Sequence, residues 1–196
     1  SCRMRGRLPR RTMHFDPIAS TVMPSFRARI INALLRLTVK PMWRPGLAIG
    51  DIRRHTAKTE KRLAKRGGDC PTEQVTIAGV RAAWYGAPEL AVRKGTLLYL
   101  HGGAWCVHLP ALYGMFAARL SALTGLRVLL VDYRLAPEHP FPAAVDDCLA
   151  VYRSLLEAVG TRPHVIAGDS AGGNLSLITL MRARDAQLPL PSCAVL

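Results

Sequence analysis

The chain has 196 residues, 49% of them hydrophobic, so it is long enough to bury the core of about one domain and is unlike disordered or fibrous proteins. Its net charge of +14 comes from residues 1–68, which hold 17 Lys and Arg against 3 Asp and Glu, whereas the remainder holds 10 of each. A basic block can attract nucleic acid or anionic lipid. This block has no Cys/His metal spacing and no basic run interleaved with aromatic residues, so we expect no nucleic-acid partner.

The cysteine pattern indicates neither a disulfide framework nor a zinc site. The five cysteines are odd in number, widely spread and without a C-x-x-C pair, which favours a reducing, cytoplasmic location. No apolar run approaches the roughly 18 residues that span a bilayer. The arginine-rich start is not followed by the apolar core of a signal peptide. We therefore expect a soluble protein.

The first third of the chain predicts two basic helices. Residues 1–12 show no apolar period and are interpreted as translated upstream sequence. Residues 26–40 place apolar side chains at helical spacing, with arginine and lysine mostly elsewhere. This pattern favours a helix packed on the domain that it precedes, and contact with an anionic membrane surface is the alternative. A second basic helix is expected over 51–66, ended by Gly67 and Gly68.

The remainder, residues 69–196, predicts an α/β core. We expect strands at 74–78, 82–85, 96–100, 127–132 and 164–167, and helices at 111–123, 143–159 and 172–186. The first two strands are close enough to form a hairpin. Apolar strands separated by helices indicate a mostly parallel sheet covered on both faces, with functional loops at the carboxyl ends of its strands. Because residues 192–196 look like the opening of another apolar strand, we expect the core to be incomplete, truncated at its C-terminus.

The sequence Gly168-Asp169-Ser170-Ala171-Gly172 lies between a predicted strand and a predicted helix. A G-x-S-x-G pattern in that context predicts a nucleophile elbow, a sharp turn that exposes the serine oxygen. Ser170 is therefore the candidate nucleophile, and Asp169 is placed as loop support. The alternative, a phosphate cradle, is disfavoured because no P-loop or dinucleotide motif is present and Asp169 would repel an anion.

A second glycine-rich turn, His101-Gly102-Gly103-Ala104-Trp105, follows the apolar strand 96–100. Backbone N–H groups from the two turns can converge on a developing oxyanion, and the expected donors are Gly102, Gly103, Ala104 and Ala171. His101 leads the turn and is interpreted as fixing the shape of the loop through hydrogen bonds, not as a base. Trp105 is expected to form a wall of the acyl pocket.

Three segments together resemble the hormone-sensitive-lipase-like branch of the α/β-hydrolase-fold esterases and lipases. They are HGGAW (101–105), DYRLAPEHPFPAA (132–144) and GDSAGGNL (168–175), in the order and spacing of that family. The resemblance runs from about Gln74 to the end and implies an α/β-hydrolase fold, with the N-terminal helices as a cap. It also implies a carboxylic-ester hydrolase that forms an acyl-enzyme on Ser170 with short- to medium-chain acyl esters, without a metal or organic cofactor. Ala104 departs from the third glycine of many members, which should matter little to a backbone donor.

The base that such a serine requires is absent from this sequence. All six histidines precede Ser170, whereas the family's catalytic acid and histidine follow the nucleophile. The resemblance therefore implies that both lie beyond Leu196 and that the chain as written has little turnover.

The acidic residues near the motifs are interpreted as structural. The resemblance implies a scaffold role for Arg134 and Glu138. Asp146 and Asp147 open a helix and precede the serine, and Asp185 is expected to be a solvated surface charge.

Two other functions remain open at the level of sequence. One is a non-catalytic protein on the same fold that binds a small ligand. The other is the same enzyme attached to a membrane through its basic N-terminal helices, with weak contact to anionic lipid and no insertion. The expected partner is a small-molecule ester, and the oligomeric state is undetermined.

Overall fold

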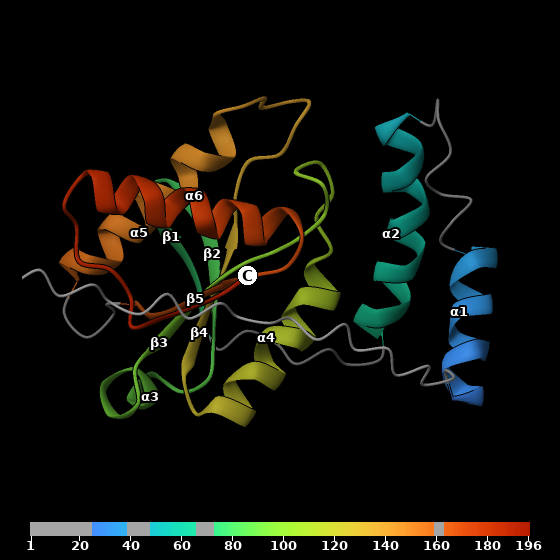
Figure 1. Cartoon of the computed structure of the whole chain (residues 1–196), viewed down its shortest axis with the longest axis horizontal. Coiled ribbons are helices and arrows are strands. Elements are labelled where there is room, and N and C mark those ends of the chain that lie inside the picture. Colours follow the sequence, from blue (N-terminus) through green and yellow to red (C-terminus); the bar gives the residue numbers. More distant parts are fainter. Residues whose placement is uncertain (1–24, 39–47, 66–72, 159–162) are drawn as a thin grey trace, which may run out of the picture. The chain divides into compact units, whose positions relative to one another are not determined.

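The computed structural model describes residues 25–38, 48–65, 73–158 and 163–196 (Figure 1). The expectations for residues 1–12 and for Gly67 and Gly68 lie outside these ranges. Contacts divide the chain into two compact units, residues 1–45 and 46–196. The division falls earlier than the expected boundary at residue 68, because the second basic helix makes its contacts with the sheet unit.

The described part of the first unit is helix α1 (Phe26–Thr38). The hydroxyl of Ser25 accepts a hydrogen bond of 3.2 Å from the amide of Ala28, as a helix N-cap does. Residues 39 and 40, the last two of the predicted helix, lie outside the described ranges. Its large apolar side chains are exposed: Phe26, Ile30, Ile31, Leu34, Leu35 and Leu37. None of the helices in the described ranges is long and apolar enough to cross a membrane.

The second unit is built on one mixed sheet with the strand order β1-β2-β4-β3-β5-β6. The strands are β1 (Glu73–Ile77), β2 (Val80–Tyr85), β3 (Thr96–Leu100), β4 (Arg127–Asp132), β5 (Pro163–Gly168) and β6 (Cys193–Val195). β1 and β2 form the expected antiparallel hairpin, and β2 is also antiparallel to β4. The other neighbours are parallel, as predicted for strands that alternate with helices.

Helices cover both faces of this sheet (Figure 1). The helices of the unit are α2 (Ile49–Lys65), α3 (Pro88–Arg93), α4 (Pro110–Thr124), α5 (Ala143–Glu157) and α6 (Ala171–Asp185). Helix α3 was not predicted from the sequence, because its six residues are too few to show a helical period. Its first residue, Pro88, suits the start of a helix, where the missing N–H costs nothing.

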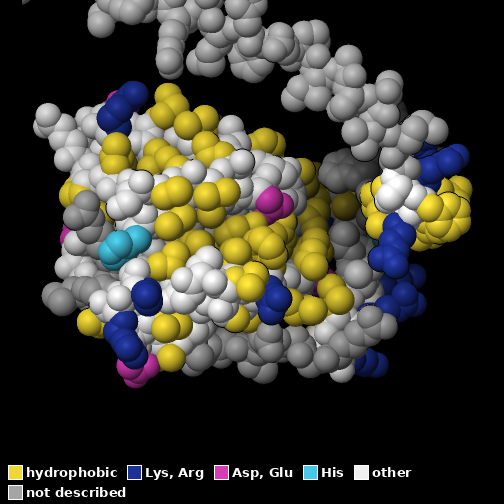
Figure 2. All heavy atoms as spheres, turned by 60° about the horizontal axis from the view of Figure 1, so that its bottom comes forward, with side chains coloured by type: hydrophobic (Ala, Val, Ile, Leu, Met, Phe, Trp, Pro, Cys, Tyr) yellow, Lys and Arg dark blue, Asp and Glu magenta, His cyan; other side chains and the backbone are white. Residues whose placement is uncertain are grey.

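The core consists of two apolar layers separated by the sheet. Leu98, Leu129 and Ile166 are fully buried in the layer that holds α5 and α6. Their strand neighbours point the other way and pack on α4, as period-2 alternation requires. The outer side of α4 is apolar as well, and Figure 2 shows apolar side chains gathered on this face of the molecule. The exposed large apolar residues of α3 and α4 are Val92, Leu112, Met115, Phe116 and Leu123.

Charged side chains of helix α2 form hydrogen bonds with the rest of the second unit. Its Glu60 carboxylate accepts bonds from the backbone N–H groups of Ala111 (2.7 Å) and Leu112 (3.3 Å). These amides open α4, whose own N-cap residue provides no side-chain bond. A carboxylate at this position satisfies unpaired amides and complements the positive end of the helix dipole.

Candidate active site

Two loops meet at the carboxyl edge of the sheet because β3 and β5 are parallel neighbours. Leu100, the last residue of β3, pairs with Gly168, the last residue of β5. The approach is so close that a Cβ on Gly172 would collide with the carbonyl oxygen of Leu100. The His-Gly-Gly turn and the serine turn are thus held side by side, although Gly102 and Asp169 are 67 positions apart in the sequence.

Ser170 occupies a strained turn between β5 and α6. Its φ of 53° and ψ of −117° place a non-glycine residue in the left-handed half of conformational space. Such a residue costs about 1–3 kcal/mol and is held there by its surroundings. The side chain is exposed. Ala171 follows as the first residue of α6, where a backbone N–H has no partner within the helix. This is the geometry of a nucleophile elbow.

The turn after β3 is tight and uses three successive positive φ angles. They are 126° at Gly103, 51° at Ala104 and 56° at Trp105. The carbonyl oxygen of Gly103 accepts bonds from the amides of Cys106 (3.0 Å) and Val107 (2.9 Å), which closes the turn. A Cβ on Gly103 would overlap the carbonyl of Val107, so only glycine fits there.

Asp169 binds the two turns to each other. Its Oδ1 accepts bonds from the Tyr99 hydroxyl (2.8 Å) and the Gly102 amide (3.0 Å), and its Oδ2 accepts one from the Tyr113 hydroxyl (2.9 Å). The Gly102 amide also lies 3.0 Å from the Tyr113 oxygen. This changes one expectation: the Gly102 N–H is already occupied by Asp169 and Tyr113, so it is not free to meet an oxyanion.

The two tyrosines of this cluster were not identified from the sequence. Burial, reinforced by the hydrogen bond to Asp169, raises the pKa of both Tyr99 and Tyr113, so the phenols remain protonated donors. The available signal was weak. Tyr99 is the one residue with a polar tip in the apolar run LLYL of β3, and a buried tyrosine hydroxyl usually has a partner.

His101 is fully buried between two aromatic rings. It stacks on Tyr133 at 4.3 Å and on His108 at 4.5 Å between ring centroids. Its Nδ1 lies 2.7 Å from the Gly102 carbonyl oxygen, and the Tyr133 hydroxyl donates a 2.6 Å bond to the carbonyl oxygen of His101. Burial, with a smaller contribution from His108, lowers the pKa of His101 to about 4. The imidazole is therefore neutral near pH 7 and held within the loop.

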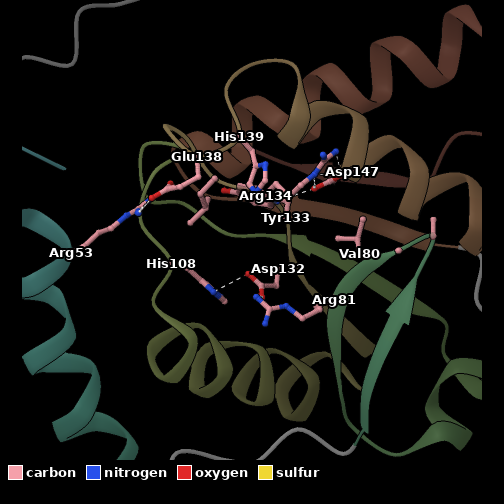
Figure 3. Close-up of a pocket in the computed structure, with 13 residues that line it drawn as sticks. Arg53, Val80, Arg81, His108, Asp132, Tyr133, Arg134, Glu138, His139 and Asp147 are labelled. Carbon is pink, nitrogen blue, oxygen red and sulfur yellow. Dashed lines mark hydrogen bonds and ion pairs between the residues drawn. The ribbon is translucent and has the colours of Figure 1, made fainter. Parts of the chain in front are cut away.

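His101, His108 and Asp132 bring possible ligand atoms within 4.8 Å of one another. Their arrangement does not suit a cation. The two imidazole planes are nearly parallel, at 18°, so their in-plane lone pairs do not converge on one point. The Asp132 carboxylate is already engaged by His108 at 3.0 Å and by Arg81 at 2.8 Å, and Figure 3 shows these contacts.

One cavity adjoins the turn after β3, and a second lies beside His108 and the loop that follows β4. The first, of about 400 Å³, is mostly apolar and is lined by Trp105, Phe141, Leu175 and Ile178 among others. Trp105, 43% exposed, contributes the indole wall. The other, of about 640 Å³, is lined by paired charged groups and is the one in Figure 3. The apolar cavity is the one that suits an acyl chain.

The remaining acidic candidates are paired with arginines. Asp147, almost fully buried, accepts bonds of 2.7–3.0 Å from the Arg134 guanidinium and one of 2.9 Å from the Arg134 amide. Glu138 pairs with Arg53 of α2. Asp146 lies 3.5 Å from Arg182, and Asp185 lies 2.8 Å from Arg184. Each carboxylate joins structural elements or lies at the surface.

A family profile described as the alpha/beta hydrolase fold matches residues 97–196. The chain belongs to this α/β-hydrolase family. The acetyl-hydrolase of Streptomyces hygroscopicus is 42% identical over 127 residues, which cover 64% of this chain and 42% of that protein. The chain thus spans less than half of this curated relative.

Solved structures of esterases share the α/β-hydrolase fold of this chain. An esterase/lipase from an uncultured bacterium has a TM-score of 0.71 at 37% identity, and the match covers 87% of this chain and 57% of that one. An esterase of the bacterial hormone-sensitive lipase family has a TM-score of 0.67 at 32% identity, covering 85% and 56%. The resemblance to the hormone-sensitive-lipase branch, stated from three sequence segments, is confirmed by these relatives.

Proposed function

We propose that this α/β-hydrolase chain carries the nucleophile and the oxyanion cradle of a serine carboxylic-ester hydrolase. The observation that carries the proposal is the strained Ser170 turn, held against the His-Gly-Gly turn by the pairing of Leu100 with Gly168. In this proposal the Ser170 oxygen attacks the acyl carbon, an acyl-enzyme forms, and water then releases the acid.

The oxyanion cradle in this proposal consists of the backbone N–H groups of Gly103, Ala104 and Ala171. Gly102 is left out because its amide donates to Asp169 and Tyr113. Preorganised amide donors of this kind are each worth about 100- to 1,000-fold in rate. The role of Asp169 is to hold the two turns together, and that of His101 is to fill and stiffen the base of the loop.

The apolar cavity beside the turn supports the proposed substrate class. A volume of about 400 Å³, with Trp105 and Phe141 among its walls, suits a short- to medium-chain acyl group. The general base and its acid partner are proposed to come from beyond Leu196, since no histidine follows Ser170. By itself, the 196-residue chain is then expected to turn over slowly, because loss of a triad histidine costs on the order of 10⁶-fold in kcat.

Initial rates of short-chain aryl-ester hydrolysis test the proposal in four proteins. They are the 196-residue chain, the chain extended to its natural stop codon, and the extended chain with Ser170→Ala or with Ser192→Ala. Ser192 is an exposed serine and serves as the matched control. The expected result is activity only in the extended wild type and in the Ser192 variant. Background rates in all four would reject the esterase and favour a protein that binds a small ligand in the same cavity.

A further inference from the structure

Helix α2 contacts the rest of its unit with a face of mixed polar and apolar side chains. Its half-buried residues recur at helical spacing: Ile49, Asp51, Ile52, Arg53, Thr56, Glu60 and Leu63. None of its residues is fully buried. The polar contacts are concentrated at Arg53 and at Glu60, about two helical turns further on.

Arg53 reaches the two loops that carry Trp105 and Ala136, both of which line the apolar cavity. Figure 3 shows Arg53 directed at Glu138. Its Nε donates a 2.7 Å hydrogen bond to the carbonyl oxygen of Cys106, and its Nη2 donates a 2.8 Å bond to the carbonyl oxygen of Ala136. Nη1 and Nη2 also bind the two carboxylate oxygens of Glu138, at 2.6 and 2.9 Å. One guanidinium therefore uses its planar fork on three acceptor groups.

These bonds close a ring that includes the oxyanion turn. The two loops are already joined by a 2.9 Å bond from the Ala136 amide to the Trp105 carbonyl oxygen. Arg53 then bonds the next carbonyl of the turn, Cys106, and returns to Ala136. The peptide groups that follow Ala104 are thereby fixed from outside the turn as well as by its internal bonds to Gly103.

We propose that Arg53 is a positioning residue through which α2 sets the conformation of the turn 103–106. When the fork is in place, the amides of Gly103 and Ala104 are held in one orientation; when it is absent, the turn keeps only its internal bonds and its link to Ala136. The catalytic consequence rests on the proposed ester hydrolysis. The structural consequence does not.

Lysine cannot replace arginine in this role. Its ammonium is a point charge that cannot present a planar fork to two backbone carbonyls and a carboxylate at once. Arg53→Lys therefore separates geometry from charge. Arg54→Met is the matched control, because Arg54 is the next residue on the same helix, is 78% exposed and bonds only Asp51 among the described residues. It removes the same charge without touching the turn.

Amide hydrogen exchange of the 196-residue chain, resolved by mass spectrometry, tests the structural part. In Arg53→Met, the amides of Cys106, Val107 and Ala136 should exchange at least about tenfold faster than in the wild type. Arg53→Lys should give most of this acceleration, and Arg54→Met none. Amides in the middle of β3 and α6 should keep their wild-type rates in all three variants.

Two outcomes would overturn the proposal. One is unchanged exchange at these three amides in Arg53→Met. The other is acceleration throughout β3 and α6, which would show that Arg53 supports the stability of the whole unit and not the turn in particular. Glu138→Gln removes the carboxylate but leaves both backbone carbonyls available to Arg53, so it separates the bonds to the loops from the ion pair. In that variant the three amides should keep at least part of their protection.

Kinetics of the extended chain test the catalytic part. If that chain hydrolyses esters, Arg53→Met should lower kcat by about tenfold or more while KM stays within about twofold, because only the transition state uses the cradle. A change in KM alone would contradict a role in positioning the oxyanion turn. An inactive extended wild type would reject the proposed function and leave the exchange result to decide the structural role.

Discussion

The buried His101 predicts a specific dependence of stability on pH. Its pKa is lowered from 6.5 to about 4, first by burial and then by repulsion from the neighbouring His108. In the unfolded chain the imidazole binds a proton at pH values where the folded protein does not. The contribution of His101 to stability therefore falls as the pH drops below about 6.5, and its loss becomes complete below about pH 4.

The size of the effect follows from the same shift. A pKa unit corresponds to about 1.4 kcal/mol, so this histidine should cost about 2 kcal/mol of unfolding free energy between about pH 8 and pH 5. The conversion is reasonable for His101 because its side chain has no solvent exposure. By about pH 4 the cost reaches about 3 kcal/mol.

Urea denaturation at several pH values from about 8 to 5 measures this loss. His101→Gln removes the titrating group, and it also removes the stacking on Tyr133, so its absolute stability will be lower. The informative quantity is the gap between wild type and variant, which should shrink by about 2 kcal/mol from about pH 8 to pH 5. His55→Gln, at an exposed position on α2, is the control and should follow the wild type. Parallel curves for the wild type and His101→Gln would refute the reasoning.

Two further changes test how the site is supported. Gly172→Ala should lower the unfolding free energy by more than about 2 kcal/mol in thermal melts, because its Cβ would collide with the backbone carbonyl of Leu100. The matched control is Gly50→Ala, at an open position on α2, which should be neutral or slightly stabilising in the same melts. Equal losses in the two variants would contradict the argument. Glu60→Gln should cost up to about 1 kcal/mol in about 0.1 M salt and less in about 1 M, since it removes a charge from the start of α4. Glu157→Gln is the control, because Glu157 is exposed and lies at the C-terminal end of α5. A loss of stability in Glu60→Gln that does not depend on salt would contradict the role of charge.

The sequence predicted the parts of the fold that depend on local pattern. The strands at 96–100 and 127–132 have the predicted bounds, because each is a largely apolar run between clear turn signals. The two glycine motifs indicated where the chain must turn sharply, and both turns are present. What failed locally was α3, since Pro88–Arg93 is a single short segment without a period.

The contacts between distant segments could not be predicted in the same way. The Gly102 amide is occupied because Tyr113 and Asp169, which belong to two other segments, lie next to it in the fold. That α2 belongs to the sheet unit depends on Arg53 and Glu60, which in sequence are two charges among many in a basic helix. The residue types alone do not indicate which charged side chain will pair with a distant segment.

The place of the candidate site, by contrast, follows from topology alone. From β3 the chain crosses to β4 on one side and returns past β3 to β5 on the other, so the strand order reverses between β3 and β5. In an open α/β sheet, a crevice forms outside the carboxyl ends of the strands at such a switch point. The Ser170 turn and the Gly103 turn end the two strands that flank it. A nucleophile and amide donors from separate loops can therefore converge there without any long connection.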